Sequence, residues 1–345
     1  MAGSSEFGPE DWVASATPRF GRGEDGLTKM PDGRYLRDVI DADADNWLGP
    51  EHVEYFGSDP ALLVKLLDAG ERLPVHVHPD RAFAVRHLGS RHGKTEAWVV
   101  LGTSGAEPVV YVGWRRDVEQ PELSRLVAAQ DTEALLGLLN RLPVEPGDAV
   151  LVPAGTAHAI GAGVFSLELQ EPTDFSIMLE LEGFDIDPAG AYLGLDRELA
   201  LSCVSRRALG QRDLAQVTLE AGPAGTKVAG AEVAGTEVAG TEVAGDVGAE
   251  GAVEDILPEA AGPYFRAQKV TGGNNANLEP SFAVVVATAG DGRLKGDGWE
   301  LAVRHGDTLV VPWAAGTVKV EGDVELLRCL PPLPVDAAKD DPGAD

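Results

Sequence analysis

The sequence predicts an all-β protein with a small helical insertion, built from two β-rich blocks. Short runs such as LPVHVHP, EAWVVLG and PVVYVGW are separated by Gly, Pro or charged residues, the pattern of an antiparallel β fold. Residues 121–142 instead space their apolar side chains at the helical period. A second β-rich block extends from Tyr264 to about Leu330.

The elements divide the chain into four regions. Residues 1–26 are rich in Gly, Ser, Pro and charge, so we expect a flexible N-terminal arm. Residues 27–220 form a first domain that carries the helical insertion at 121–142, and its early run ALLVKLLDAG fits a strand or a helix. Residues 221–260 include a five-residue repeat, VAGTE, whose period matches neither structure, so we expect a low-complexity linker or loop. Residues 261–345 form the second domain.

Composition excludes several classes of function. The 28 basic and 56 acidic residues give a net charge of −28, which disfavours binding to nucleic acid or to an anionic membrane surface. Two cysteines, Cys203 and Cys329, are too few for a disulfide framework and have no metal-ligand spacing. We therefore expect a soluble protein of the reducing cytoplasm.

Three segments bring together side chains that bind metals. His76 and His78 are two residues apart in a predicted strand, so they project from the same face. Glu96 enters another strand beside Lys94, and His158 follows a strand and a tight Pro/Gly turn. Imidazole and carboxylate in this ratio suit Zn, Mn, Fe or Ni, so His76, His78, Glu96 and His158 are the candidate ligands of one divalent metal.

These motifs resemble those of the cupin superfamily, and within it those of type I mannose-6-phosphate isomerase in its short bacterial form. The segment Gly147–His158 matches the second cupin signature, and LLVKLLDAGERLPVHVHPD, GKTEAWVVL and LELQEPTD occur in the order of the isomerase family. The resemblance implies two cupin (jelly-roll) barrels and a metal, usually zinc. It also implies that His76 stands where the family has Gln and that Lys94 is an active-site lysine.

The second β block resembles the same signature without its chemistry. The run from Gly306 to Val318 repeats the glycine and proline positions, but the histidine is missing and no HxH precedes it. We expect a metal-free, cupin-like domain that packs against the first.

Two positions depart from the isomerase family. Pro74 replaces the serine that opens the family's metal-binding run, and Met178 replaces the arginine that lies over the substrate. A thioether cannot grip a phosphate as a guanidinium does. The expected substrate is therefore mannose 6-phosphate, fructose 6-phosphate or a related sugar that need not be phosphorylated.

The function predicted from these residues is a metal-dependent aldose–ketose isomerase. Such a reaction needs a Lewis acid and a base that moves a proton, and Lys94, Glu168 and Glu171 are the candidate catalytic residues. The alternatives are another metal-dependent cupin enzyme (an epimerase, lyase or oxygenase) or a sugar-binding cupin without turnover. The sequence indicates neither the oligomeric state nor the role of the repeat.

Overall fold

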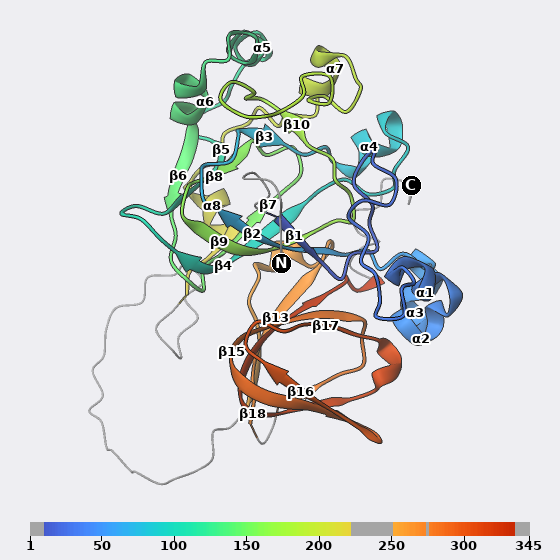
Figure 1. Ribbon diagram of the computed structural model, residues 1–345. Coiled ribbons are helices and arrows are strands. Elements are labelled where there is room, and N and C mark those ends of the chain that lie inside the picture. The colour runs from blue at the N-terminus through green and yellow to red at the C-terminus, as the bar shows by residue number, and fades with distance from the viewer. Residues whose placement is uncertain (1–9, 222–250, 274–275, 335–345) are drawn as a thin grey trace, which may run out of the picture.

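The structure is a computed structural model that describes residues 10–221, 251–273 and 276–334 (Figure 1). The VAGTE repeat, which we predict to be a linker, lies outside the described residues. No helix in the described part of the chain has the length and apolar character needed to span a membrane.

Two antiparallel sheets face each other in the N-terminal domain. The first has the strand order β1 (Glu10–Val13), β2 (Leu63–Ala69), β9 (Val164–Gln170), β4 (Glu96–Thr103), β7 (Ala149–Val152) and β11 (Thr218–Leu219). The second has the order β10 (Ile177–Met178), β3 (His76–Val77), β8 (His158–Ile160), β5 (Val109–Trp114) and β6 (Leu139–Pro143). A buried cluster that includes Trp98, Val110, Val150 and Ile160 fills the space between them, as in a β-barrel.

Helices cover the outside of this barrel. Leu123, Leu126 and Leu135, which recur at helical spacing, pack with Val75 and Val77 on the outer face of the second sheet. The predicted helical insertion corresponds to α5 (Gln120–Ala129) and α6 (Thr132–Leu138), whereas its last residues, from Leu139 on, begin strand β6. The other helices are α1 (Leu36–Ala42), α2 (Ala44–Leu48), α3 (Pro50–Phe56), α4 (Arg81–His87), α7 (Arg197–Leu201) and α8 (Gln211–Val217).

The C-terminal domain is a single curled sheet of seven strands. Its main order is β12 (Ala252–Asp255), β13 (Arg266–Thr271), β18 (Val318–Leu330), β15 (Ala283–Gly296) and β16 (Trp299–Arg304). Two short strands complete it, β14 (Asn277–Leu278) on β18 and β17 (Thr308–Val311) on β15. The sheet encloses a core of its own that includes Val270, Val285, Leu294 and Leu326. Short 3-10 helices lie at Glu259–Ala261 and Trp313–Ala315.

Two predicted boundaries need correction. Residues 10–13 of the expected flexible arm form β1, which pairs with the edge of β2 and buries Val13. Residues 252–255 of the expected linker form β12, which pairs with β13. Both segments are polar in composition, but each supplies hydrogen bonds to a sheet edge that would otherwise be unpaired.

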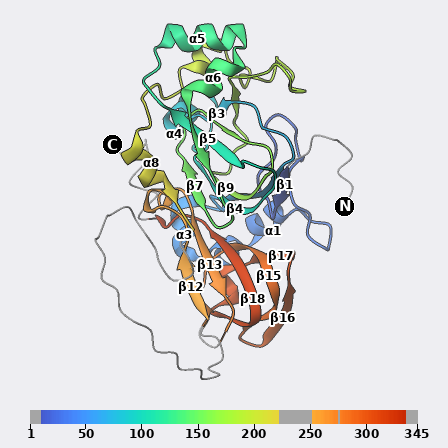
Figure 2. The ribbon, with the colours of Figure 1, turned by 90° about the vertical axis from the view of Figure 1, so that its left-hand side faces the viewer.

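A shared hydrophobic core joins the two domains. Successive side chains of β4, in the first sheet, point to opposite faces. Trp98 and Val100 face the barrel interior, whereas Ala97 and Val99 face outward. The outward side chains pack in one cluster with Phe265, Phe282 and Leu327 of the C-terminal sheet. Figure 2 shows α5 and α6 at the end of the molecule away from the C-terminal sheet. The inward side chains of the first sheet, such as Glu96 and Trp98, line the cavity inside the barrel.

Candidate metal centre

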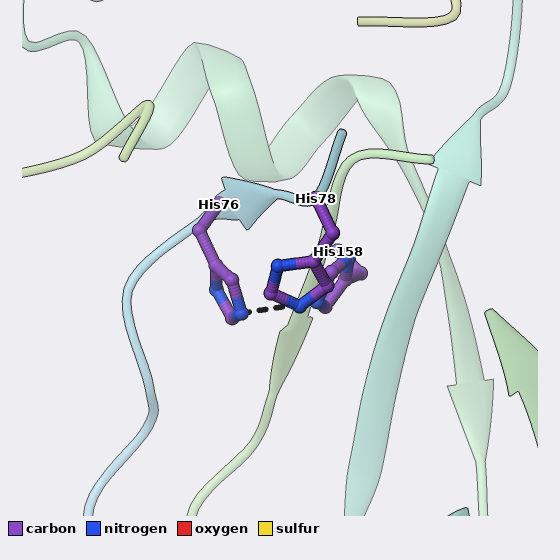
Figure 3. Close-up of side chains that lie close together, drawn as sticks. All are labelled: His76, His78 and His158. Carbon is purple, nitrogen blue, oxygen red and sulfur yellow. Dashed lines mark hydrogen bonds between the residues drawn. The ribbon is translucent and has the colours of Figure 1, made fainter. Parts of the chain in front are cut away.

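Three histidines from neighbouring strands converge inside the N-terminal barrel. His76 and His158 are register partners on β3 and β8, and His78 follows β3 directly. One ring nitrogen from each of the three lies within 4.8 Å of the others. Figure 3 shows the three rings pointing toward one another. No other group of three or more His, Cys, Asp or Glu side chains meets this geometry among the residues that the structure describes.

Backbone carbonyls fix the orientation of all three rings. The Nδ1 atoms of His76 and His158 lie 2.8 Å from the carbonyl oxygens of Pro74 and Thr156, each two residues earlier in the chain. His78 Nδ1 lies 2.7 Å from the carbonyl oxygen of Phe175. A carbonyl only accepts hydrogen bonds, so each Nδ1 carries the proton and each neutral ring presents the lone pair of Nε2 to the centre.

The Nε2 atoms need a cation between them. His76 Nε2 and His158 Nε2 are 3.0 Å apart, and in this tautomer both are acceptors. Burial, together with the neighbouring rings, lowers the pKa of His76 well below its usual value, and burial beside Lys94 lowers the pKa of His78 to about 3. His76 and His78 therefore stay neutral, and the donor set fits a divalent metal.

Glu96 adds a carboxylate to the same centre. It begins β4, and its side-chain oxygens lie 3.0 Å from His78 Nε2 and 3.3 Å from His158 Nε2. Burial opposes the negative charge, but Lys94 and the imidazoles together hold the pKa of Glu96 well below its usual value. The structure thus brings together the side chains of all four ligands that the sequence predicts: His76, His78, Glu96 and His158.

Lys94 points into this cluster. Its Nζ atom lies 2.9 Å from Glu96 Oε2 and 2.9 Å from His78 Nε2, and the side chain is buried. A primary amine at this position can donate to, or accept a proton from, a molecule bound beside the histidines.

Glu168 lies on the neighbouring strand β9 with two unexpected partners. Trp98 Nε1 donates to Glu96 Oε1 at 3.1 Å and to Glu168 Oε2 at 3.3 Å, so one indole joins the two carboxylates. Burial and the nearby Glu96 raise the pKa of Glu168. Lys65 Nζ lies 3.4 Å from Glu168 Oε1. Glu168 is therefore a carboxyl group suited to exchange protons.

Glu171 is directed elsewhere. Its carboxylate accepts hydrogen bonds from Arg81 Nε at 2.7 Å and from the backbone N–H of Thr95 at 2.8 Å. Arg81 also donates to the carbonyl oxygen of Pro263 in the C-terminal part of the chain and lies over the Tyr264 ring. Glu171 does not line the cavity next to His76. The structure therefore places Glu171 outside the site in which the sequence predicts it to act.

A cavity of about 160 Å³ is lined by His76, Lys94 and Glu96 of this cluster. Pro74 and Met178 both line it, and Met178 is the register partner of His76. Sequence reasoning missed Glu10, Lys65, Trp98 and Asp174, which also line it. Trp98 is two residues after Glu96 in the same strand, so the sequence alone indicates that both side chains lie on one face. Glu10 and Lys65 are 55 residues apart and meet only because β1 pairs with β2.

The C-terminal domain holds no comparable cluster in the residues described. His305 lies in the turn between β16 and β17 and is exposed.

Comparisons with known proteins agree on one group of relatives. The chain is 29% identical over 330 residues to the mannose-6-phosphate isomerase of Streptococcus mutans, covering 94% of this chain and 88% of that protein. It is 27% identical over 268 residues to the mannose-6-phosphate isomerase ManA of Bacillus subtilis, covering 77% and 73%. No protein-family model matches the chain.

Solved structures share the fold. The crystal structure of the Bacillus subtilis mannose 6-phosphate isomerase aligns with a TM-score of 0.64 at 24% identity, over 94% of this chain and 90% of that one. A mannose 6-phosphate isomerase bound with zinc and yttrium aligns with a TM-score of 0.59 at 16% identity, over 87% and 86%. The predicted fold class, all-β with a small helical insertion and two cupin (jelly-roll) barrels, is confirmed by this likeness as a mostly β, cupin-like fold, with further helices outside the insertion.

Proposed function

We propose that the protein is a metal-dependent aldose–ketose isomerase that interconverts mannose, mannose 6-phosphate or a related aldose with the corresponding ketose. The observation that carries this proposal is the convergence of three imidazole Nε2 atoms and the Glu96 carboxylate beside the Lys94 amine. The homologues named mannose-6-phosphate isomerase, which match most of the chain, support this reaction class.

We assign the metal to His76, His78, Glu96 and His158, in the cupin-type barrel of residues 27–220. Three neutral imidazoles and one carboxylate are ligands that divalent metals prefer, and zinc is the metal that suits this set best, with Mn, Fe and Ni as the alternatives. A divalent metal bound there would supply Lewis-acid polarisation of the oxygens at C1 and C2 of the sugar. The domain of residues 261–345 is assigned no metal.

Lys94 and Glu168 are the proposed proton-transfer residues. Aldose–ketose isomerisation moves one hydrogen from C2 to C1 and one proton from the C2 hydroxyl to the C1 oxygen, without a redox partner. A base must therefore take a proton from carbon and return it one carbon away. Lys94 Nζ lies 2.9 Å from Glu96 Oε2 and 2.9 Å from His78 Nε2, and Glu168 has a raised pKa because it is buried near Glu96.

The test is metal analysis followed by an isomerase assay. Purified protein should contain about one divalent metal per chain, chelation should abolish turnover of an aldose–ketose pair, and re-addition of zinc should restore it. The assay is run without oxygen and in D₂O, where solvent deuterium at C1 or C2 of the product indicates proton transfer through a base. Absence of isomerisation by the metal-loaded protein across hexoses, pentoses and their phosphates would refute the proposal.

A further inference from the structure

We propose that the cavity beside the histidines selects an uncharged sugar over the phosphate ester of that sugar. This inference rests on the proposed isomerase function and concerns the charge of the substrate at the same site. Three observations carry it: the charges that line the cavity, the partners of its two lysines, and the apolar side chain of Met178.

The cavity lining carries an excess of negative charge. Its charged side chains are two lysines, Lys65 and Lys94, and four carboxylates, Glu10, Glu96, Glu168 and Asp174. With all of them ionised the balance is 2 − 4 = −2, and with a proton on Glu168, whose pKa is raised, it is −1, so the side chains of the lining supply no excess of positive charge. A phosphate monoester brings a further charge of about −1.5 to −2 at neutral pH. The side chains of the lining leave that charge without compensation.

Both lysines are already paired. Lys94 Nζ lies 2.9 Å from Glu96 Oε2. Lys65, only 1% exposed, lies 3.3 Å from Glu10 Oε1 and 3.4 Å from Glu168 Oε1. Its ammonium also stands 4.8 Å from the centre of the Trp12 ring. Each ammonium is thus already neutralised by a carboxylate of the protein.

The wall next to His76 offers no cation. Met178 is the register partner of His76, and together with Leu73 and Pro74 it lines this part of the cavity with apolar side chains. The hydroxyl of Ser176, which also lines the cavity, is uncharged. Arg72 is close in sequence, but both its terminal nitrogens donate to Glu180, at 2.7 and 2.6 Å. Within the described residues that line the cavity, a phosphate therefore finds no unpaired basic group.

The same lining suits a neutral polyol. Sugar hydroxyls donate as well as accept hydrogen bonds, and the Glu168 and Asp174 carboxylates that face the cavity are strong acceptors. The phosphate group only accepts hydrogen bonds, so, unlike the hydroxyl that it replaces, it cannot donate to these carboxylates. Charge and hydrogen-bonding capacity thus both favour a ligand with hydroxyl groups alone.

The experiment compares kcat/KM for mannose and for mannose 6-phosphate in the zinc-loaded full-length protein. We expect the wild type to prefer mannose. Met178→Arg places a guanidinium beside His76, and we expect it to shift the ratio of the two kcat/KM values toward mannose 6-phosphate by about tenfold or more, because one charge-assisted hydrogen bond is gained. Met178→Gln, a neutral side chain of similar length, is the matched control and should keep the wild-type ratio.

Two outcomes overturn the inference: a wild-type preference for mannose 6-phosphate, or equal shifts with Arg and Gln at position 178. If no sugar is isomerised, the proposed function fails by itself, and calorimetric binding to the zinc-loaded wild type decides the charge preference. The probes are mannose, fructose and ribose, each beside its phosphate ester. Binding of the free sugars but not of the esters supports the inference, whereas tighter binding of the esters, or binding of neither, contradicts it.

Discussion

Replacing His158 by alanine is the sharpest test of the metal centre. Structural zinc sites bind with an apparent free energy of about 10–16 kcal/mol, so four protein ligands contribute about 2.5–4 kcal/mol each. At about 1.4 kcal/mol per factor of ten, losing one ligand should weaken zinc binding by about 10²- to 10³-fold. His158 is fully buried and its ring contacts Glu96 and His76, so no neighbouring solvent-exposed group stands in for it.

The assay titrates zinc into chelator-treated protein and follows metal content, heat of binding and thermal midpoint. The wild type should gain stability with zinc, because only the folded state holds the ligands together, and His158→Ala should gain much less. His52→Ala is the control, since His52 is also buried but its Nε2 contacts the carbonyl oxygen of Asp59 outside the centre. Folded His158→Ala that binds zinc as tightly as the wild type would refute the reasoning.

Three further predictions concern Glu180 and Lys94. Glu180 is 1% exposed and accepts hydrogen bonds from Arg72, the Val75 N–H and Thr132. In urea titrations, Glu180→Ala should therefore lower the free energy of unfolding by about 3 kcal/mol. A loss below about 1 kcal/mol would show that the partly exposed Arg72 is rehydrated in the variant without cost. Burial opposes ionisation of Glu180, but these partners lower its pKa below the ordinary 4.5. Its contribution to the free energy of unfolding is therefore complete above pH 4.5 and is lost as the pH falls through the lower pKa of the folded state. The wild type should lose stability below pH 4.5 more steeply than Glu180→Ala, and parallel curves of stability against pH would contradict this. Lys94→Met should retain zinc yet lower kcat by about 10²- to 10⁴-fold if the amine transfers protons, whereas unchanged kcat would assign that role to Glu168.

The β fold and the four candidate ligands could be predicted because both depend on local patterns. Strand parity places His76 and His78 on one face, and the Pro/Gly turn before His158 ends a strand at a fixed distance. Those residues meet in the structure as their spacing indicates.

The remaining parts of the site depend on contacts between distant segments. Lys65 belongs to the ALLVKLLDAG run, which fits a strand or a helix, and its partner Glu10 lies in a segment whose composition indicates a loose arm. Glu171 was a reasonable candidate by position, yet Arg81 from α4 binds its carboxylate. No local pattern reports such pairings, because they arise when strands and helices pack.

The two faces of β4 constrain how this protein can change during evolution. Glu96 and Trp98 serve the cavity, while Ala97 and Val99, one residue out of step, bind the C-terminal domain. Inserting or deleting a single residue in this strand would exchange the two sets, turning the carboxylate toward the domain interface and the apolar side chains toward the histidines. Substitutions within β4 and changes in the loops at its ends can therefore alter the substrate preference during evolution. A change in the length of the strand would instead disrupt both the cavity and the packing of the C-terminal domain.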